Sequence, residues 1–164
     1  MKYKRADKRR GVQTAIPRPG EGKRGPEGHL AYLVRQANVA VRAALEKALA
    51  DVEVTPPQFS VLTMIVAYPG LSGADLARLT FLTPQTINVI VGNLERADAV
   101  TKSADATHGR ILRLTATAKG RRLLTRCRTR VAAVERKLAG LAGRADERVV
   151  RHWLAAVGAA LGRA

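Results

Sequence analysis

Apolar residues recur at helical spacing twice within residues 71–100, and each recurrence follows a polar residue suited to start a helix. Ser72 is suited to be an N-cap, with Asp75 at the third helical position, and together they predict a capping box. Thr83 repeats the cap, and Pro84 suits the first position of the next helix. The pattern predicts two short helices joined by a tight turn, the second beginning at Pro84.

The second of these helices has one apolar side and one mainly polar side. Its apolar residues lie three and four positions apart and are expected to face a core: Ile87, Ile90, Val91 and Leu94. The other residues point away from that core: Gln85, Thr86, Asn88, Val89, Asn93 and Arg96. Two capped helices at this spacing are typical of a helix-turn-helix, whose second helix enters the major groove of DNA.

Two further helices are predicted before this motif. Leucine, valine and alanine recur at helical spacing over residues 29–49 and form a wide apolar stripe. Thr55 and Gln58 predict another capping box, followed by a helix that stops at the Pro69-Gly70 pair.

A hairpin and two helices are predicted after the motif. Short segments at Val100–Ala104 and Arg110–Leu114 flank a tip that contains Asp and Gly, which is the pattern of a β-hairpin. Thr115 then opens a long helix, residues 140–143 break it, and a last amphipathic helix follows. A hairpin directly after a recognition helix is typical of a wing. The sequence therefore predicts a mainly α fold, a winged helix-turn-helix with a two-stranded wing and long flanking helices.

The flanking helices carry more apolar surface than this small core can cover. One stripe runs along residues 28–50 and another along residues 115–162, where the spacing resembles a coiled-coil seam. Burial against a second copy is the most economical solution, so we predict a homodimer. Two copies also supply two half-sites, about 34 Å apart when they are one turn apart on a duplex.

Positive charge points to the partner. The chain holds 29 Lys and Arg against 13 Asp and Glu, a net charge of +16, which favours a polyanion such as double-stranded DNA. Nine of the basic residues fall within residues 1–26, where prolines and glycines break any period. We expect a disordered basic arm that lies on phosphates or reaches a minor groove, and a solubilising tail or expression remnant is the alternative.

Other classes of function find little support in the residues. There is neither a membrane-spanning apolar run nor a signal peptide, so we expect a cytoplasmic protein with no membrane partner. His29 and His152 lack neighbours at ligand spacing, so no metal or other cofactor is expected. Cys127 lies on the apolar seam and is interpreted as a buried, inert thiol rather than a redox sensor. Without a catalytic grouping or a phosphate-binding loop, the chain is not expected to be an enzyme.

Several of these segments together resemble the MarR family of bacterial transcriptional regulators. The segments that carry the likeness are residues 55–62, 69–77, 83–95 and 114–120, and it extends over roughly residues 28–162. The resemblance implies a domain over residues 27–164, with a winged core at about 55–115 and dimerisation helices at about 28–50 and 115–162.

The resemblance also implies a way of working. It implies a dimer on an inverted-repeat operator, often released when a small phenolic, aromatic or other lipophilic effector binds. A wing arginine, here Arg110, is implied in the minor groove. Many relatives carry an acidic residue and two arginines at the wing tip, where this chain has Thr107-His108-Gly109-Arg110. Many also carry a basic residue where Val89 stands, and a valine there could contact a thymine methyl group instead.

Two functions remain in competition. The leading hypothesis is an operator-specific transcriptional regulator, more often a repressor than an activator. The alternative is an architectural or nucleoid protein that coats DNA through charge with little sequence preference. For Arg96 a phosphate contact competes with plain exposure to solvent, and for His108 a DNA contact competes with a free, exposed position. The residues expected at the DNA are Ser72, Thr83, Pro84, Gln85, Thr86, Asn88, Val89, Asn93, Arg96, His108 and Arg110.

Overall fold

The computed structural model describes residues 16–105 and 111–162. The chain divides into two units, Met1–Ala40 and Val41–Ala164, and helix α1 (Leu30–Leu49) begins in the first and continues into the second. Among the residues described, no helix is both long enough and apolar enough to cross a membrane.

In the first unit a short 3-10 helix, η1 (Gly22–Arg24), precedes α1. The Arg24 side chain organises this turn, since its Nη1 donates to the carbonyl oxygen of Pro17 at 2.9 Å. Backbone hydrogen bonds close the same turn, so the disorder predicted for residues 1–26 differs from the structure here. Residues 1–15, which hold most of the predicted arm, lie outside the described residues.

Local hydrogen bonds start the next helices where the sequence predicts. The helical elements after α1 are η2 (Ala50–Val52), α2 (Pro56–Ala67), α3 (Gly73–Thr80), α4 (Pro84–Arg96) and α5 (Ala118–Leu161). Thr55 and Gln58 form the capping box of α2, and Ser72 and Asp75 form that of α3. The predicted helix-turn-helix is therefore the pair α3 and α4.

The turn between α3 and α4 is tight and partly strained. Phe81 ends α3 with φ 54° and ψ 30°, a left-handed conformation that is uncommon for a bulky residue. Thr83 then caps α4, because its hydroxyl accepts from the backbone N of Thr86 at 3.2 Å. The cap and the proline at the first position of α4 fix where the second helix begins.

The predicted wing is present, with its second strand displaced. β1 (Val100–Ala104) pairs antiparallel with β2 (Leu112–Ala116), and Val100 lies opposite Ala116. The segment predicted as the second strand, Arg110–Leu114, therefore begins and ends two residues too early.

The long helix starts correspondingly later than predicted. Thr117, not Thr115, is the N-cap of α5: its hydroxyl accepts from the backbone N of Gly120 at 3.0 Å. The same hydroxyl donates to the carbonyl oxygen of Asp98 at 2.6 Å. This contact ties the start of α5 to the turn that follows α4, and β2 therefore extends to Ala116.

α5 spans 44 residues and bends at one position. Gly143, with φ 71° and ψ 161°, is its non-helical residue, so the predicted break over residues 140–143 is confirmed at Gly143 while Gly140 stays helical. Along the predicted seam Cys127 is fully buried, whereas Leu141 is 78% exposed. The first part of the seam therefore packs inside this chain, and the later part does not.

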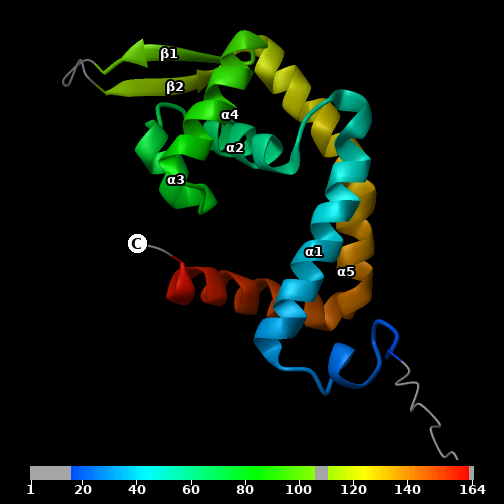
Figure 1. Cartoon of the computed structure of the whole chain (residues 1–164). Helices are drawn as coiled ribbons and strands as arrows, with labels where there is room; N and C mark the ends of the chain where they lie inside the picture. Colours follow the sequence, from blue (N-terminus) through cyan, green and yellow to red (C-terminus); the bar gives the residue numbers. More distant parts are fainter. Residues whose placement is uncertain (1–15, 106–110, 163–164) are drawn as a thin grey trace, which may run out of the picture. The chain divides into compact units, whose positions relative to one another are not determined.

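Two clusters of buried side chains hold the second unit together. The larger joins α2, α3, α4 and the wing to the start of α5: Val61, Leu62, Ile65, Leu76, Ile87, Ile90, Val91, Leu94, Ala99, Val100, Leu114, Ala116 and Leu124. The smaller packs the end of α1 and η2 against α5: Leu49, Val52, Val54, Cys127 and Val131. Figure 1 shows α2, α3 and α4 gathered beside the hairpin of β1 and β2. The architecture is mainly α with a two-stranded wing, as predicted.

Candidate nucleic-acid interface

α4 is held by one face and presents the other to solvent. The residues that dock it are at most 6% exposed: Ile87, Ile90, Val91 and Leu94. The residues exposed on the opposite side include Gln85, Thr86, Asn88 and Val89. The structure thus places these four side chains where a DNA groove could be contacted, and their role at the DNA stays a prediction.

A single row runs along the middle of the exposed face. Seven residues make nearly two helical turns, so Gly92 lies almost directly beyond Gln85, and Val89 and Arg96 lie on the same line. Asn88 lies beside this row, toward the wing, where it lines a shallow hollow together with Lys102. The row combines a polar residue at its start, a valine and a glycine in its middle, and a cation at its end.

The end of the row folds back on its own helix. Nη2 of Arg96 donates to Oδ1 of Asn93, and its Nε donates to the carbonyl oxygen of Gly92 at 3.3 Å. Both side chains are predicted to contact DNA. In this structure they are paired with each other, so a phosphate contact requires the Arg96 guanidinium to turn outward.

Ser72, Thr83 and Pro84 lie at the N-termini of α3 and α4. The hydroxyl of Ser72 donates to Oδ2 of Asp75 at 2.7 Å, and its backbone N donates to the same oxygen at 2.9 Å. These hydrogen bonds favour the ionised carboxyl and lower the pKa of Asp75 to about 2, with a smaller contribution from Arg78. The carboxylate also suits the positive end of the α3 dipole. The Ser72 side chain is thus engaged in folding, and its contact with DNA stays a prediction.

Arg113 on β2 connects the base of the wing to the helix-turn-helix. Its Nε donates to Oδ2 of Asp105 at 2.6 Å, and its Nη1 donates to the carbonyl oxygen of Gly70 at 3.2 Å. The guanidinium also lies 3.9 Å from Oδ2 of Asp75 at the start of α3. Sequence reasoning missed this residue, and no local pattern marks it because Gly70 is 43 positions away in the chain.

A second link joins the wing to α4. Nζ of Lys102 on β1 lies 2.7 Å from Oε2 of Glu95 near the end of α4. The two links hold the base of the hairpin against the helices that carry the exposed row. The predicted tip residues His108 and Arg110 lie outside the described residues.

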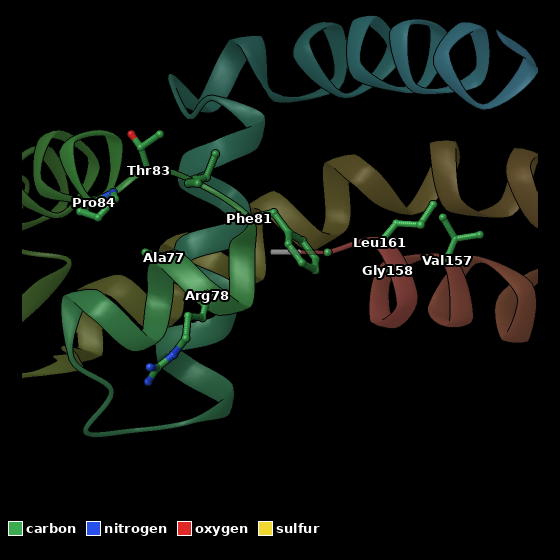
Figure 2. Close-up of a pocket in the computed structure, with 10 residues that line it drawn as sticks. Ala77, Arg78, Phe81, Thr83, Pro84, Val157, Gly158 and Leu161 are labelled. Atoms are coloured by element: carbon green, nitrogen blue, oxygen red, sulfur yellow. The ribbon is translucent and has the colours of Figure 1, made fainter. Parts of the chain in front are cut away.

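A pocket of about 550 Å³ adjoins the turn before α4. The residues that line it are Ala77, Arg78, Phe81, Leu82, Thr83, Pro84, Val157, Gly158, Leu161 and Gly162. Figure 2 shows the Phe81 ring reaching from the turn toward Val157 and Leu161 at the end of α5. The walls are mostly apolar, and Arg78 is the charged side chain among them. Thr83 and Pro84, the first residues of the recognition helix, form part of the wall.

Residues outside the helix-turn-helix offer less chemistry. Cys127 is fully buried, and burial raises the pKa of its thiol, which disfavours the reactive thiolate. On α5, Arg130 pairs with Asp51 at 2.7 Å, while Arg122 and Arg126 line an open hollow. Across residues 16–105 and 111–162, no group of three or more His, Cys, Asp or Glu side chains is placed to hold a metal ion.

Comparison with known proteins agrees with this geometry. A sequence profile of the MarR family matches residues 53–111. The HTH-type transcriptional repressor Rv2887 of Mycobacterium tuberculosis is 38% identical over 109 residues, which cover 66% of this chain and 78% of the repressor. The structure of Rv2887 in complex with salicylic acid has a TM-score of 0.64 and 34% identity, covering 79% of this chain and 96% of that one. The transcriptional repressor CouR bound to a 23-mer DNA duplex has a TM-score of 0.75 and 27% identity, covering 80% of this chain and 94% of CouR.

Proposed function

We propose, since the chain belongs to the MarR family, whose members are DNA-binding regulators and not enzymes, that it is a homodimeric transcriptional repressor acting in the cytoplasm. Each protomer places α4 in the major groove of one half of an inverted-repeat operator, and the wing contacts the flanking DNA. A small aromatic or lipophilic molecule binds the protein and releases it from the operator.

One observation carries the proposal: α4 is rigidly docked and its opposite face is free. Four buried apolar residues and the Thr83 cap fix the helix, so the polar side chains on the other face hold defined positions. Base recognition depends on such positioning, because hydrogen bonds to base edges are directional. CouR, a repressor with a similar fold, is bound to a DNA duplex in its structure, which supports the same role here.

The dimer is supported by apolar side chains that this chain leaves in solvent. On α5 these are Leu138, Leu141, Val149, Val150, Trp153, Leu154 and Leu161, and on α1 they include Leu30, Tyr32 and Val39. Contiguous apolar surface of this kind marks an interface in soluble proteins. A two-fold pairing through these helices gives the two recognition helices that an inverted repeat needs.

Selection from a duplex library with a randomised central segment tests the function. The full-length protein enriches one sequence with two-fold symmetry, and that duplex binds at least about a thousandfold more tightly than an unrelated duplex at ~0.15 M salt. Equal affinity for both duplexes contradicts the proposal and favours the alternative, charge-driven coating of DNA, which the net charge of +16 motivates. Deleting residues 1–26 separates the two functions further: a regulator keeps its preferred site with weaker affinity, while a coating protein loses most of its binding.

The pocket beside the α3–α4 turn is the site we assign to the effector. Its apolar walls suit an aromatic ring, and Arg78 offers a positive charge for an acid group. Phe81 supports a functional role because this bulky residue is 61% exposed and stays in a left-handed conformation that favours glycine or asparagine. An occupant displaces the start of α4 directly, since Thr83 and Pro84 are part of the wall. Rv2887, a relative, binds salicylic acid in its structure.

Phe81→Asn tests this assignment. Asparagine tolerates the left-handed conformation, so the turn and DNA binding persist, while loss of the aromatic wall weakens effector binding by about tenfold or more. Small aromatic acids, beginning with salicylate, are screened by thermal shift, and a molecule that binds the folded protein raises its melting temperature. Leu79→Asn, an exposed apolar residue on α3 outside the pocket, is the matched control. An unchanged ligand response in Phe81→Asn contradicts the assignment.

A further inference from the structure

Gly92 lies in the interior of α4, where glycine is an unfavourable residue. It is the ninth residue of a 13-residue helix and is absent from the residues with positive φ, so its backbone is ordinary right-handed helix. Glycine in such a place costs stability relative to alanine, because it loses more backbone freedom on folding and gains no packing. A reason for its presence is therefore needed.

Packing within the chain gives no such reason. A Cβ added at Gly92 meets no atom within 4 Å, so an alanine fits without displacing anything. Gly120 shows the contrasting case, because a Cβ there lies 2.0 Å from the carbonyl oxygen of Ala99. Folding explains Gly120 and leaves Gly92 unexplained.

The position of Gly92 on the helix points to a reason outside the chain. It lies on the exposed row between Val89, which is 64% exposed, and Arg96, directly opposite the buried face of α4. Any surface that receives this face meets the helix first along the row. At Gly92 that surface can approach the helix backbone itself, since no side chain stands between them.

We propose that Gly92 is a specificity-determining residue: its missing side chain lets the floor of the major groove lie against the backbone of α4. This inference rests on the proposed function. Hydrogen bonds from Gln85 and Asn88 to base edges need donor–acceptor distances of about 2.7–3.2 Å, so a helix held further from the floor loses them. The bare backbone at Gly92 and the short side chain of Val89 together set how deeply the helix enters.

Gly92→Ala is expected to change stability and operator affinity in opposite directions. The melting temperature rises by about 1–4 °C because alanine favours the helix. The affinity for the duplex that the parent protein enriches from the randomised library falls by about tenfold, and Gly92→Leu lowers it further. Affinity for an unrelated duplex of the same composition stays within about twofold, because that binding depends on charge. Fluorescence anisotropy and thermal denaturation, both on the full-length protein, give these values.

Gly140→Ala is the matched control, since Gly140 is also a helical glycine whose added Cβ meets no atom within 4 Å, and it lies on α5. It raises the melting temperature without lowering operator affinity. Unchanged operator affinity in Gly92→Ala and Gly92→Leu overturns the inference while the proposed function stands. An equal loss on both duplexes also overturns it, because the residue then affects DNA binding in general. A parent protein that enriches no sequence removes the proposed function and this inference with it.

Discussion

Replacing Gln85 and Asn88 together with alanine lowers operator affinity by about a hundredfold and leaves binding to an unrelated duplex nearly unchanged. Both side chains are exposed on the face of α4 opposite its buried residues. Each amide can donate to and accept from one base edge, and a good pair of such bonds discriminates by about 1–3 kcal/mol. Two lost contacts therefore remove most of the preference for one sequence. Anisotropy titrations with the enriched and the unrelated duplex measure the ratio.

The control for this double variant is Thr125→Ala with Thr129→Ala on α5. Both threonines are exposed, and each hydroxyl donates to a carbonyl one turn earlier in its own helix, at 3.1 Å. This control changes neither the net charge nor α4, so operator affinity stays at the parent value. If the Gln85 and Asn88 variant keeps its full preference for the operator, α4 is not the reading helix, and the basic arm has to account for binding.

Gly120→Ala destabilises the fold by about 3 kcal/mol and lowers the melting temperature by about 6–12 °C. Gly120 is buried in the first turn of α5, where a Cβ lies 2.0 Å from the carbonyl oxygen and 2.9 Å from the carbonyl carbon of Ala99. The colliding atoms are backbone atoms of the segment between α4 and β1, so no side chain can rotate away. Either α5 or the base of the wing has to shift, and the cap at Thr117 weakens with it.

Chemical and thermal denaturation of the purified protein measure this effect. Gly140→Ala serves as the comparison, because the same chemical change there meets no atom within 4 Å and stabilises the helix slightly. A Gly120→Ala variant that melts at or above the parent temperature means that the joint between α5 and the wing accommodates a methyl group, and the close approach to Ala99 is then not a constraint.

Helix starts could be predicted because their determinants are local. Thr55 with Gln58, and Ser72 with Asp75, satisfy free N–H groups three residues away, so the sequence contains both partners of each bond. The buried face of α4 was predictable for the same reason, since periodicity alone separates Ile87 and Ile90 from the exposed side. The candidate interface therefore followed from residues within one short stretch.

The wing shows where local information ends. Threonines at 115 and 117 are both plausible helix caps, and the choice falls on Thr117 because its hydroxyl also donates to the carbonyl oxygen of Asp98, 19 positions earlier. The register of β2 follows from that joint. Arg113 was missed on the same grounds, as its partners Asp105 and Gly70 come together only in the folded chain. The pocket at Phe81 likewise combines residues from α3, the start of α4 and the end of α5.

The length of α5 has a consequence for how related proteins can vary. Its early residues, such as Leu124, pack against the DNA-reading core, while later ones, such as Leu141, are left for the partner in the proposed dimer. Each residue inserted or removed between these positions turns the two faces relative to each other by about 100°. Single-residue insertions or deletions here therefore misdirect the subunits on the duplex, and changes of about seven residues, close to two full turns, are the ones that preserve alignment. Evolution can lengthen or shorten this helix only in such steps if the same operator geometry is to be kept.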